Sequence, residues 1–234
     1  MAAATDLARP TARRLLLTLE HLGYVRSQDG SYMLTPRILE LGMSYIGAQG
    51  IWDIARPHLE GLVASTKESS SMSQLDGSDI VYIARVSVPK IIGLSVQIGT
   101  RFPAVATSMG HVLLSEMPAK TLDAVLATPS QSNVIPRIKP SRKDLASTLA
   151  EVRRKGWAVS DERLSLGIRS IAAPVRDASG AIVAAVNVTV NAAETSMTTL
   201  RSQHLPLLLE TARAITDDFA RVSHLPQVEV DTPR

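Results

Sequence analysis

The first clearly periodic stretch of the chain runs from Arg9 to Val25 and reads RPTARRLLLTLEHLGYV. Apolar residues recur there at the i, i+3, i+4, i+7 spacing of one side of a helix, and polar residues such as Arg14 occupy the other side. Pro10 suits a first helical turn and Gly23 suits a stop. The pattern predicts an amphipathic helix whose packing side is formed by Ala12, Leu15, Leu16, Leu19 and Leu22.

A short strand, a turn and a second short strand follow this helix. Asp29-Gly30 is the pair best able to take the positive φ angles of a tight hairpin between residues 24–26 and 32–34. A polar-faced helix followed by a small ribbon is the ending of a winged helix-turn-helix, in which the helix enters the DNA major groove and the ribbon lies along the backbone. An ordinary surface helix with three arginines fits the same residues, so this pattern alone leaves both interpretations open.

The rest of the chain mixes helical and strand periods, which predicts an α+β fold with an antiparallel sheet. Thr35-Pro36 is a typical helix start and opens a linker helix, whereas Pro57 is expected to kink or restart the next one. Pro174 suggests an edge strand or a bulge. The predicted helices are 51–66, a helix beginning at Thr107-Ser108, 122–127, 143–155 and 200–222, and the predicted strands are 72–75, 80–86, 92–98, 157–161, 169–176 and 181–190.

Two polar features interrupt the apolar pattern and are candidate chemistry. The backbone N–H groups of Ser108, Met109 and Gly110 open a helix and could bind an anion such as a carboxylate, unless Thr107 simply caps its own helix. The strand 181–190 is apolar on both faces except for Asn187 and Thr189. Buried polar groups need partners, so this pair either bonds neighbouring protein or lines a pocket.

Composition limits the class of protein. The chain has 234 residues, 45% of them hydrophobic, which is enough for two domains. It contains no apolar run as long as a membrane span, which takes roughly 20 residues, and no signal-peptide pattern. The absence of cysteine excludes disulfides and fits a reducing cytoplasm. No nucleophile elbow, P-loop or metal-spaced histidine pair occurs, so we expect no catalytic residue, no metal site and no cofactor.

Several segments in this order along the chain resemble the IclR family of bacterial transcriptional regulators. They are ARPTARRLLLTLEHLGYV, LTPRILELG, GTRFPAVATSMGHVLLSEM, RRKGWAVSDERLSLGIRSIAAPVRDASG and AAVNVTVNA. Within that family they look most like the regulators of aromatic catabolism through the β-ketoadipate pathway, which respond to protocatechuate, 4-hydroxybenzoate or related acids.

The resemblance implies a cytoplasmic homodimer or dimer of dimers that binds double-stranded operator DNA. Its implied domains are a partial winged helix-turn-helix at 1–35, a linker helix at 36–50, a GAF-like α/β effector-binding domain at 51–222 and a flexible tail at 223–234. Family members carry a complete first helix before the residues that align with Met1. We therefore expect a longer working protein, and in this form partly exposed side chains at Leu15, Leu19 and Leu22.

The resemblance also implies the site residues. For DNA they are Arg9, Thr11, Arg13 and Arg14 on the helix, and Arg26 as a phosphate contact on the wing. For the effector they are Leu94, Phe102, Ser108, Met109, Ser160, Ile168, Ser170, Asn187 and Thr189. A small aromatic carboxylate would place its acid on the Ser108 and Met109 amides, its ring against the apolar members of this set, and a ring hydroxyl on the polar ones. Ser160 stands where some relatives carry an acidic residue.

The predicted function is therefore transcriptional regulation of aromatic-compound catabolism, controlled by a small aromatic carboxylate of the protocatechuate or 4-hydroxybenzoate type. Two alternatives come from other classes. One is an effector-binding sensor that has lost DNA binding, and the other is a small-molecule enzyme.

Overall fold

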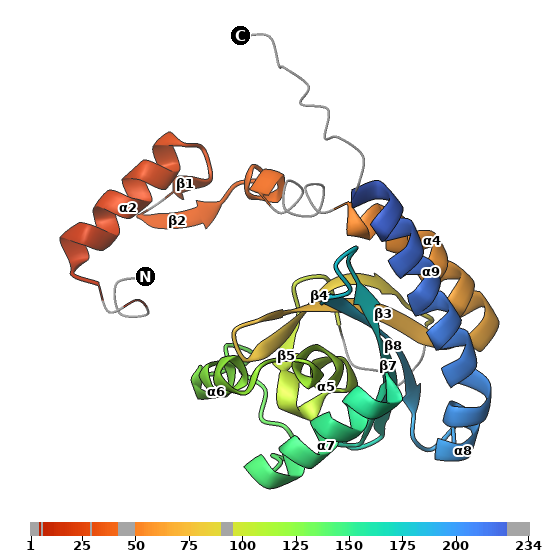
Figure 1. Cartoon of the computed structure of the whole chain (residues 1–234). Coiled ribbons are helices and arrows are strands. Elements are labelled where there is room, and N and C mark those ends of the chain that lie inside the picture. The colour runs from red at the N-terminus through yellow and green to blue at the C-terminus, as the bar shows by residue number, and fades with distance from the viewer. Residues whose placement is uncertain (1–4, 6, 29, 42–49, 90–95, 224–234) are drawn as a thin grey trace. The chain divides into compact units, whose positions relative to one another are not determined.

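The computed structural model describes residues 5, 7–28, 30–41, 50–89 and 96–223 (Figure 1). The chain divides into two compact units, Met1–Gln49 and Gly50–Arg234. This division falls at the end of the predicted linker helix. Residues 42–49 of that helix lie outside the described residues, as do Leu94 and the tail from residue 224.

The N-terminal unit contains the predicted helix and hairpin, which are α2 (Arg9–His21), β1 (Val25–Gln28) and β2 (Ser31–Leu34). Pro10 lies in the first turn of α2, and Gly23 follows the helix with a φ of 79° that favours glycine. Gln28 pairs with Ser31, so the hairpin closes on two residues that include Gly30, whose φ is 78°.

The leucine side of α2 is mostly uncovered by the described residues. Ala12 is buried, but Leu15 and Leu22 are each 45% exposed. Contacts with the hairpin hold the helix instead: the Glu20 carboxylate accepts hydrogen bonds from the Ser27 backbone N–H at 2.9 Å and from the Ser27 hydroxyl at 2.6 Å. The hydroxyl and then the amide of Ser27 lower the pKa of Glu20.

The described residues of the second unit form a six-stranded sheet with the order β5-β4-β3-β8-β7-β6, and each neighbouring pair is antiparallel. The strands are β3 (Ser69–Asp76), β4 (Asp79–Val86), β5 (Arg101–Pro103), β6 (Ala158–Asp161), β7 (Ile168–Arg176) and β8 (Ile182–Asn191). The helices are α4 (Ile51–Thr66), η1 (Ala104–Ala106, a 3₁₀ turn), α5 (Ser108–Ser115), α6 (Ala119–Ala127), α7 (Arg142–Lys155), α8 (Met197–Thr199), η2 (Leu200–His204, a π turn) and α9 (Leu205–Ser223).

Two apolar clusters lie on opposite faces of this sheet. One joins the sheet to α4 and α9, through residues such as Leu59, Val186 and Leu208. The other joins it to α5 and α7, through residues such as Met109 and Leu149 (Figure 1). None of the described helices is long and apolar enough to cross a bilayer.

The alternation along β8 explains how one strand serves both clusters. Ala184, Val186 and Val188 face α4 and α9, while the intervening residues face the other side, as the sequence predicts. Ile182 was predicted on the face of Ala184 but packs on the α5 side, and Val183 was predicted on the opposite face but packs on the α4 and α9 side. The cause is a shift in the register of β8 with β7 between Val175 and Arg176.

Three sequence predictions need correction. The third strand of the meander is β5, since the described residues 96–98 are not a strand; Pro103 ends β5 at the edge of the sheet, where its missing N–H is tolerated. Pro57 does not restart α4, which runs unbroken from Ile51 to Thr66. The last helix is not α-helical from Leu200, because a π turn precedes Pro206, which cannot donate a helical hydrogen bond.

Candidate functional site

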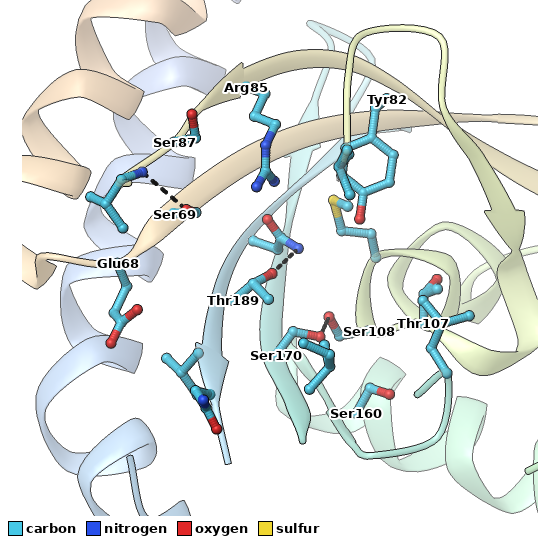
Figure 2. Close-up of a pocket in the computed structure, with 18 of the residues that line it drawn as sticks. Glu68, Ser69, Tyr82, Arg85, Ser87, Thr107, Ser108, Ser160, Ser170 and Thr189 are labelled. Carbon is cyan, nitrogen blue, oxygen red and sulfur yellow. Dashed lines mark hydrogen bonds between the residues drawn. The ribbon is translucent and has the colours of Figure 1, made fainter. Parts of the chain in front are cut away.

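A cavity of about 370 Å³ opens on the sheet face that α5 covers. Its floor comes from the sheet, and one wall is the start of α5 (Figure 2). Of the residues proposed for ligand binding from the sequence, those that line this cavity are Ser108, Met109, Ser160, Ile168, Ser170, Asn187 and Thr189.

Strand register arranges the polar floor in two rows. In the first row, Ser69, Thr189, Ser170 and Ser160 are successive cross-strand partners on β3, β8, β7 and β6. Cross-strand partners project from the same face, and neighbouring strands lie about 4.8 Å apart, so this row of hydroxyl groups spans about 14 Å. The floor is therefore a polar strip that runs across the strands.

The second row contains Arg85, Ser71 and Asn187 on β4, β3 and β8. The Arg85 guanidinium donates to the Ser71 hydroxyl at 3.0 Å, and the Ser71 backbone N–H donates to Asn187 Oδ1 at 3.0 Å. Asn187 Nδ2 in turn donates to Thr189 Oγ1 at 3.0 Å. Because these bonds occupy the oxygen of Asn187 and one acceptor site of Thr189, both side chains have N–H or O–H hydrogens left to donate.

Arg85 gives this corner of the cavity its charge. It is half-buried, and burial lowers the pKa of its guanidinium. An arginine side chain is not deprotonated in proteins, so Arg85 keeps its positive charge. Among the described residues that line the cavity, Arg85 supplies the positive charge and Glu68 the negative charge. Figure 2 shows Arg85 pointing into the cavity above Thr189, with Glu68 on another side. This corner offers donors and a cation, which suits a carboxylate.

The start of α5 forms the opposite wall. Thr107 caps the helix, since its hydroxyl oxygen accepts from the Gly110 N–H at 3.0 Å. The Gly110 amide is therefore occupied, which agrees with the capping alternative that the sequence left open. Ser108 and Met109 are the first two helical residues, whose N–H groups have no partner within a helix. The Ser108 and Ser170 hydroxyl oxygens are 2.7 Å apart, so one donates to the other.

Two predicted ligand residues do not appear on the described cavity wall. Phe102 is only 5% exposed and packs edge-on against Tyr82, with the ring centroids 5.7 Å apart. Tyr82 lines the cavity in its place, and burial raises the pKa of Tyr82 to about 12. Leu94 lies outside the described residues.

His111 makes the stability of the α5 region depend on pH. Its side chain is fully buried, its Nε2 donates to the Val105 carbonyl oxygen at 2.8 Å, and burial lowers its pKa from 6.5 to about 4. The unfolded chain takes up this proton below about pH 6.5, whereas the folded chain does so only near pH 4. The free energy of unfolding should therefore fall as the pH is lowered through this interval.

Denaturant unfolding of wild type and His111→Gln at about pH 7.5 and about pH 5 measures this contribution. We expect the glutamine variant, which can still donate to Val105, to lose less stability than wild type over that interval. Equal losses in the two proteins would show that His111 does not cause the pH dependence.

The N-terminal unit carries the residues proposed for DNA. Arg9, Arg13, Arg14 and Arg26 are exposed, and none of them forms an ion pair with a described residue. Thr11 is half-buried. One hollow between α2 and the hairpin is lined by Arg9, Arg13, Ser27 and Tyr32, together with apolar residues of α2. Unpaired arginines beside a small hairpin can contact phosphates and base edges of DNA.

In the described ranges, no group of three or more His, Asp or Glu side chains is placed to hold a metal ion.

Comparison with known families decides the identity of the chain. Residues 43–217 match the family model described as the C-terminal part of the bacterial transcriptional regulator IclR, and residues 1–29 match the IclR helix-turn-helix domain. The chain belongs to the IclR family. It is thus a transcriptional regulator and not an enzyme, as the sequence predicts.

Individual IclR-family relatives agree with this assignment. The chain is 36% identical over 210 residues to the Pca regulon regulatory protein of Pseudomonas putida, covering 89% of this chain and 72% of the relative. It is 32% identical over 220 residues to the p-hydroxybenzoate hydroxylase transcriptional activator of Acinetobacter baylyi, covering 92% and 81%. A crystal structure of a double mutant of the PobR inducer-binding domain from Acinetobacter, in complex with 3-hydroxybenzoic acid, is 30% identical and superposes with a TM-score of 0.62, covering 70% of this chain and 96% of that one.

The IclR-type motifs led to seven residues of the cavity wall but not to Arg85. Arg85 follows the apolar run Ile80-Val81-Tyr82-Ile83-Ala84 in β4. An arginine in an otherwise buried strand is the signal that could have found it, because such a charge needs a partner or a ligand.

Proposed function

We propose that this chain regulates transcription of genes for aromatic-acid catabolism, with operator DNA bound by the N-terminal unit and a hydroxylated aromatic carboxylate bound in the cavity of the C-terminal unit. The observation that carries the proposal is the donor-rich corner formed by Arg85, Asn187 and Thr189 in a cavity of about 370 Å³, a size that suits one small ligand. Relatives that regulate aromatic catabolism, and one that binds 3-hydroxybenzoic acid, support the ligand class.

The ligand carboxylate lies against Arg85 in this proposal, rather than on the α5 amides. A cation with further N–H and O–H donors stabilises a carboxylate more strongly than two amides of one helix end, which carry only partial charge. Arg85 lies on β4 and Ser170 on β7, three strand spacings apart, or about 14 Å between the backbones. A benzoate ring with a distal hydroxyl fits between the long arginine and the short serine side chains.

In this proposal the hydroxyl groups of Ser108 and Ser170 form hydrogen bonds with the distal ring hydroxyl of the ligand. Their mutual hydrogen bond uses one of two hydroxyl hydrogens, so the pair can still both donate to a phenol oxygen and accept from a phenol hydrogen. Ser160 donates to the Ala106 carbonyl oxygen at 3.1 Å, which leaves its oxygen as an acceptor. A hydroxybenzoate therefore satisfies this wall better than benzoate does, and Met109 and Ile168 contact its ring.

DNA binding falls to Arg9, Thr11, Arg13 and Arg14 of α2, with Arg26 on the wing as a phosphate contact. The protein acts on chromosomal DNA in the cytoplasm as a homodimer or a dimer of dimers, which places one α2 on each half-site of an operator. The ligand changes operator affinity only to the extent that it binds one conformation of the protein more tightly than another.

Fluorescence anisotropy with labelled promoter fragments, measured with and without 4-hydroxybenzoate, 3-hydroxybenzoate and protocatechuate, tests the proposal. We expect Arg14→Ala to weaken operator binding about 10-fold and, where Arg14 contacts a phosphate, to reduce the salt slope by about 1. Arg56→Ala removes an exposed arginine of α4 that pairs with Glu60, and it should leave operator affinity unchanged.

No preference of the wild-type chain for any promoter fragment, with or without these acids, would contradict the regulatory function. Ligand binding without operator binding would instead support the sensor that has lost DNA binding.

A further inference from the structure

The C-terminal end of α2 is held by residues that follow the hairpin, and Arg37 makes most of these contacts. Its Nη1 donates to the Leu22 carbonyl oxygen at 2.8 Å, and its guanidinium carbon lies 5.4 Å from the centroid of the Tyr24 ring. Its Nε lies 3.3 Å from Glu40, on the helical residues 38–41. One side chain thus joins the end of α2, the entry to the hairpin and the first turn of the segment that leads to the second unit.

Thr35 adds a second set of bonds at the same place. Its hydroxyl donates to the Gly23 carbonyl oxygen at 2.5 Å, and its N–H donates to the Tyr24 carbonyl oxygen at 3.0 Å. Gly23 leaves room for this arrangement, because a Cβ there would lie 3.2 Å from Arg37 Nη1 and 3.5 Å from Arg37 Cδ. The contacts of Arg37 and Thr35 with Leu22, Gly23 and Tyr24 are called the α2 clamp below.

The chemistry of the clamp suits its position. The last carbonyl groups of a helix have no partner within the helix and carry a partial negative charge, so a guanidinium there gains both a hydrogen bond and a favourable charge interaction. The Arg37 side chain is 53% exposed, so its contacts add little to folding stability. Loss of the Arg37 side chain should therefore weaken the attachment of residues 35–41 to the end of α2 without unfolding the N-terminal unit.

We propose that Arg37 is the positioning residue through which the ligand state of the C-terminal unit reaches α2. The inference rests on the proposed function and names its regulatory connection. Residues 38–41 follow the clamp along the chain, and α4 begins the second unit at Ile51. Within that unit α4 packs on β3 and β4, the strands that carry Ser69 and Arg85 of the cavity. Any reorientation of residues 38–41 moves α2 with them, as long as the α2 clamp holds the two together.

The test measures coupling between ligand and DNA in the full-length chain. Operator affinity is determined with and without saturating 4-hydroxybenzoate for wild type, Arg37→Met and Arg37→Lys, and ligand affinity is determined by calorimetry. Allosteric coupling typically changes affinity about 5- to 150-fold. We expect Arg37→Met to reduce the ligand-dependent ratio of operator affinities to less than about 2-fold, while ligand affinity stays within about 2-fold of wild type. Arg37→Lys, which restores a cation beside Leu22, should recover part of the ratio.

Two matched variants separate this effect from loss of charge. Glu40→Gln removes the ion pair of Arg37 but keeps its bond to Leu22, and Arg56→Met removes a comparably exposed arginine with a similar ion pair in α4. Both should keep the wild-type ratio.

A wild-type ratio in Arg37→Met would overturn the proposal. The proposal would also be overturned if the salt dependence of operator binding by Arg37→Met had a slope smaller by about 1 than that of wild type. Arg37 would then be a phosphate contact. If the operator affinity of wild type does not depend on the ligand, the proposed ligand-controlled function is contradicted, and with it the role of Arg37 in transmitting the ligand state.

Discussion

Arg85→Met should weaken binding of 4-hydroxybenzoate by about 30-fold or more, because removal of one partner of a desolvated charge pair costs about 2–5 kcal/mol. Methionine keeps an apolar stem in the cavity but leaves the ligand carboxylate without its cation. Arg85→Lys should give an intermediate affinity, since an ammonium keeps the charge but cannot present two parallel N–H groups. Isothermal calorimetry on the full chain gives all three dissociation constants.

The uncharged analogue 4-hydroxybenzamide provides the control for Arg85. Wild type should prefer the acid over the amide, and Arg85→Met should lose most of that preference while its affinity for the amide changes little. If the variant binds the acid as tightly as wild type does, the carboxylate is held elsewhere. The amides of Ser108 and Met109 would then be the next candidates.

Gly110→Ala should destabilise the C-terminal unit by about 3 kcal/mol or more and abolish ligand binding. A Cβ on Gly110 would lie 2.0 Å from the Ala104 carbonyl oxygen and 2.4 Å from the Ala104 Cα, and these are backbone atoms that cannot move aside like a flexible side chain. Either α5 separates from η1 or the wall of the cavity is displaced. Thermal or denaturant unfolding, followed together with ligand binding, measures both effects.

Gly61→Ala is the matched control for this prediction. Gly61 lies inside α4, and a Cβ there would meet nothing within 4 Å. The same substitution should stabilise the unit by about 0.5–1 kcal/mol, because alanine loses less conformational freedom in a helix than glycine does. Similar stabilities of the two variants would show that the contact between Gly110 and Ala104 does not constrain the fold.

The features that the sequence predicted well are those fixed by short-range chemistry. Thr107 caps α5 because a threonine before a helical run accepts an N–H from the first turn. Gly30 turns the hairpin because it tolerates a positive φ. Asn187 and Thr189 were found because simple alternation along β8 holds where they lie.

Arg85 and Tyr82 were missed because their placement depends on another strand. They are three residues apart, so strict alternation puts them on opposite faces. The register of β3 with β4 shifts between Met72 and Ser73, so that Ser71 faces Arg85 while Ser73 faces Tyr82, and both side chains reach the cavity. A shift of this kind arises from pairing between strands, so the sequence of β4 alone does not show which face of the sheet Arg85 and Tyr82 share.

The two rows of floor residues limit how the protein could be redesigned as a biosensor for other acids. Ser69, Thr189, Ser170 and Ser160 belong to paired strands, and Asn187 also accepts from the β3 backbone, so substitutions there disturb the sheet as well as the ligand. Met109 on α5 and Ile168, the first residue of β7, contribute apolar wall and not hydrogen bonds to the two rows. A library confined to Met109 and Ile168 would change the size of the cavity while leaving Arg85, the proposed carboxylate contact, unchanged.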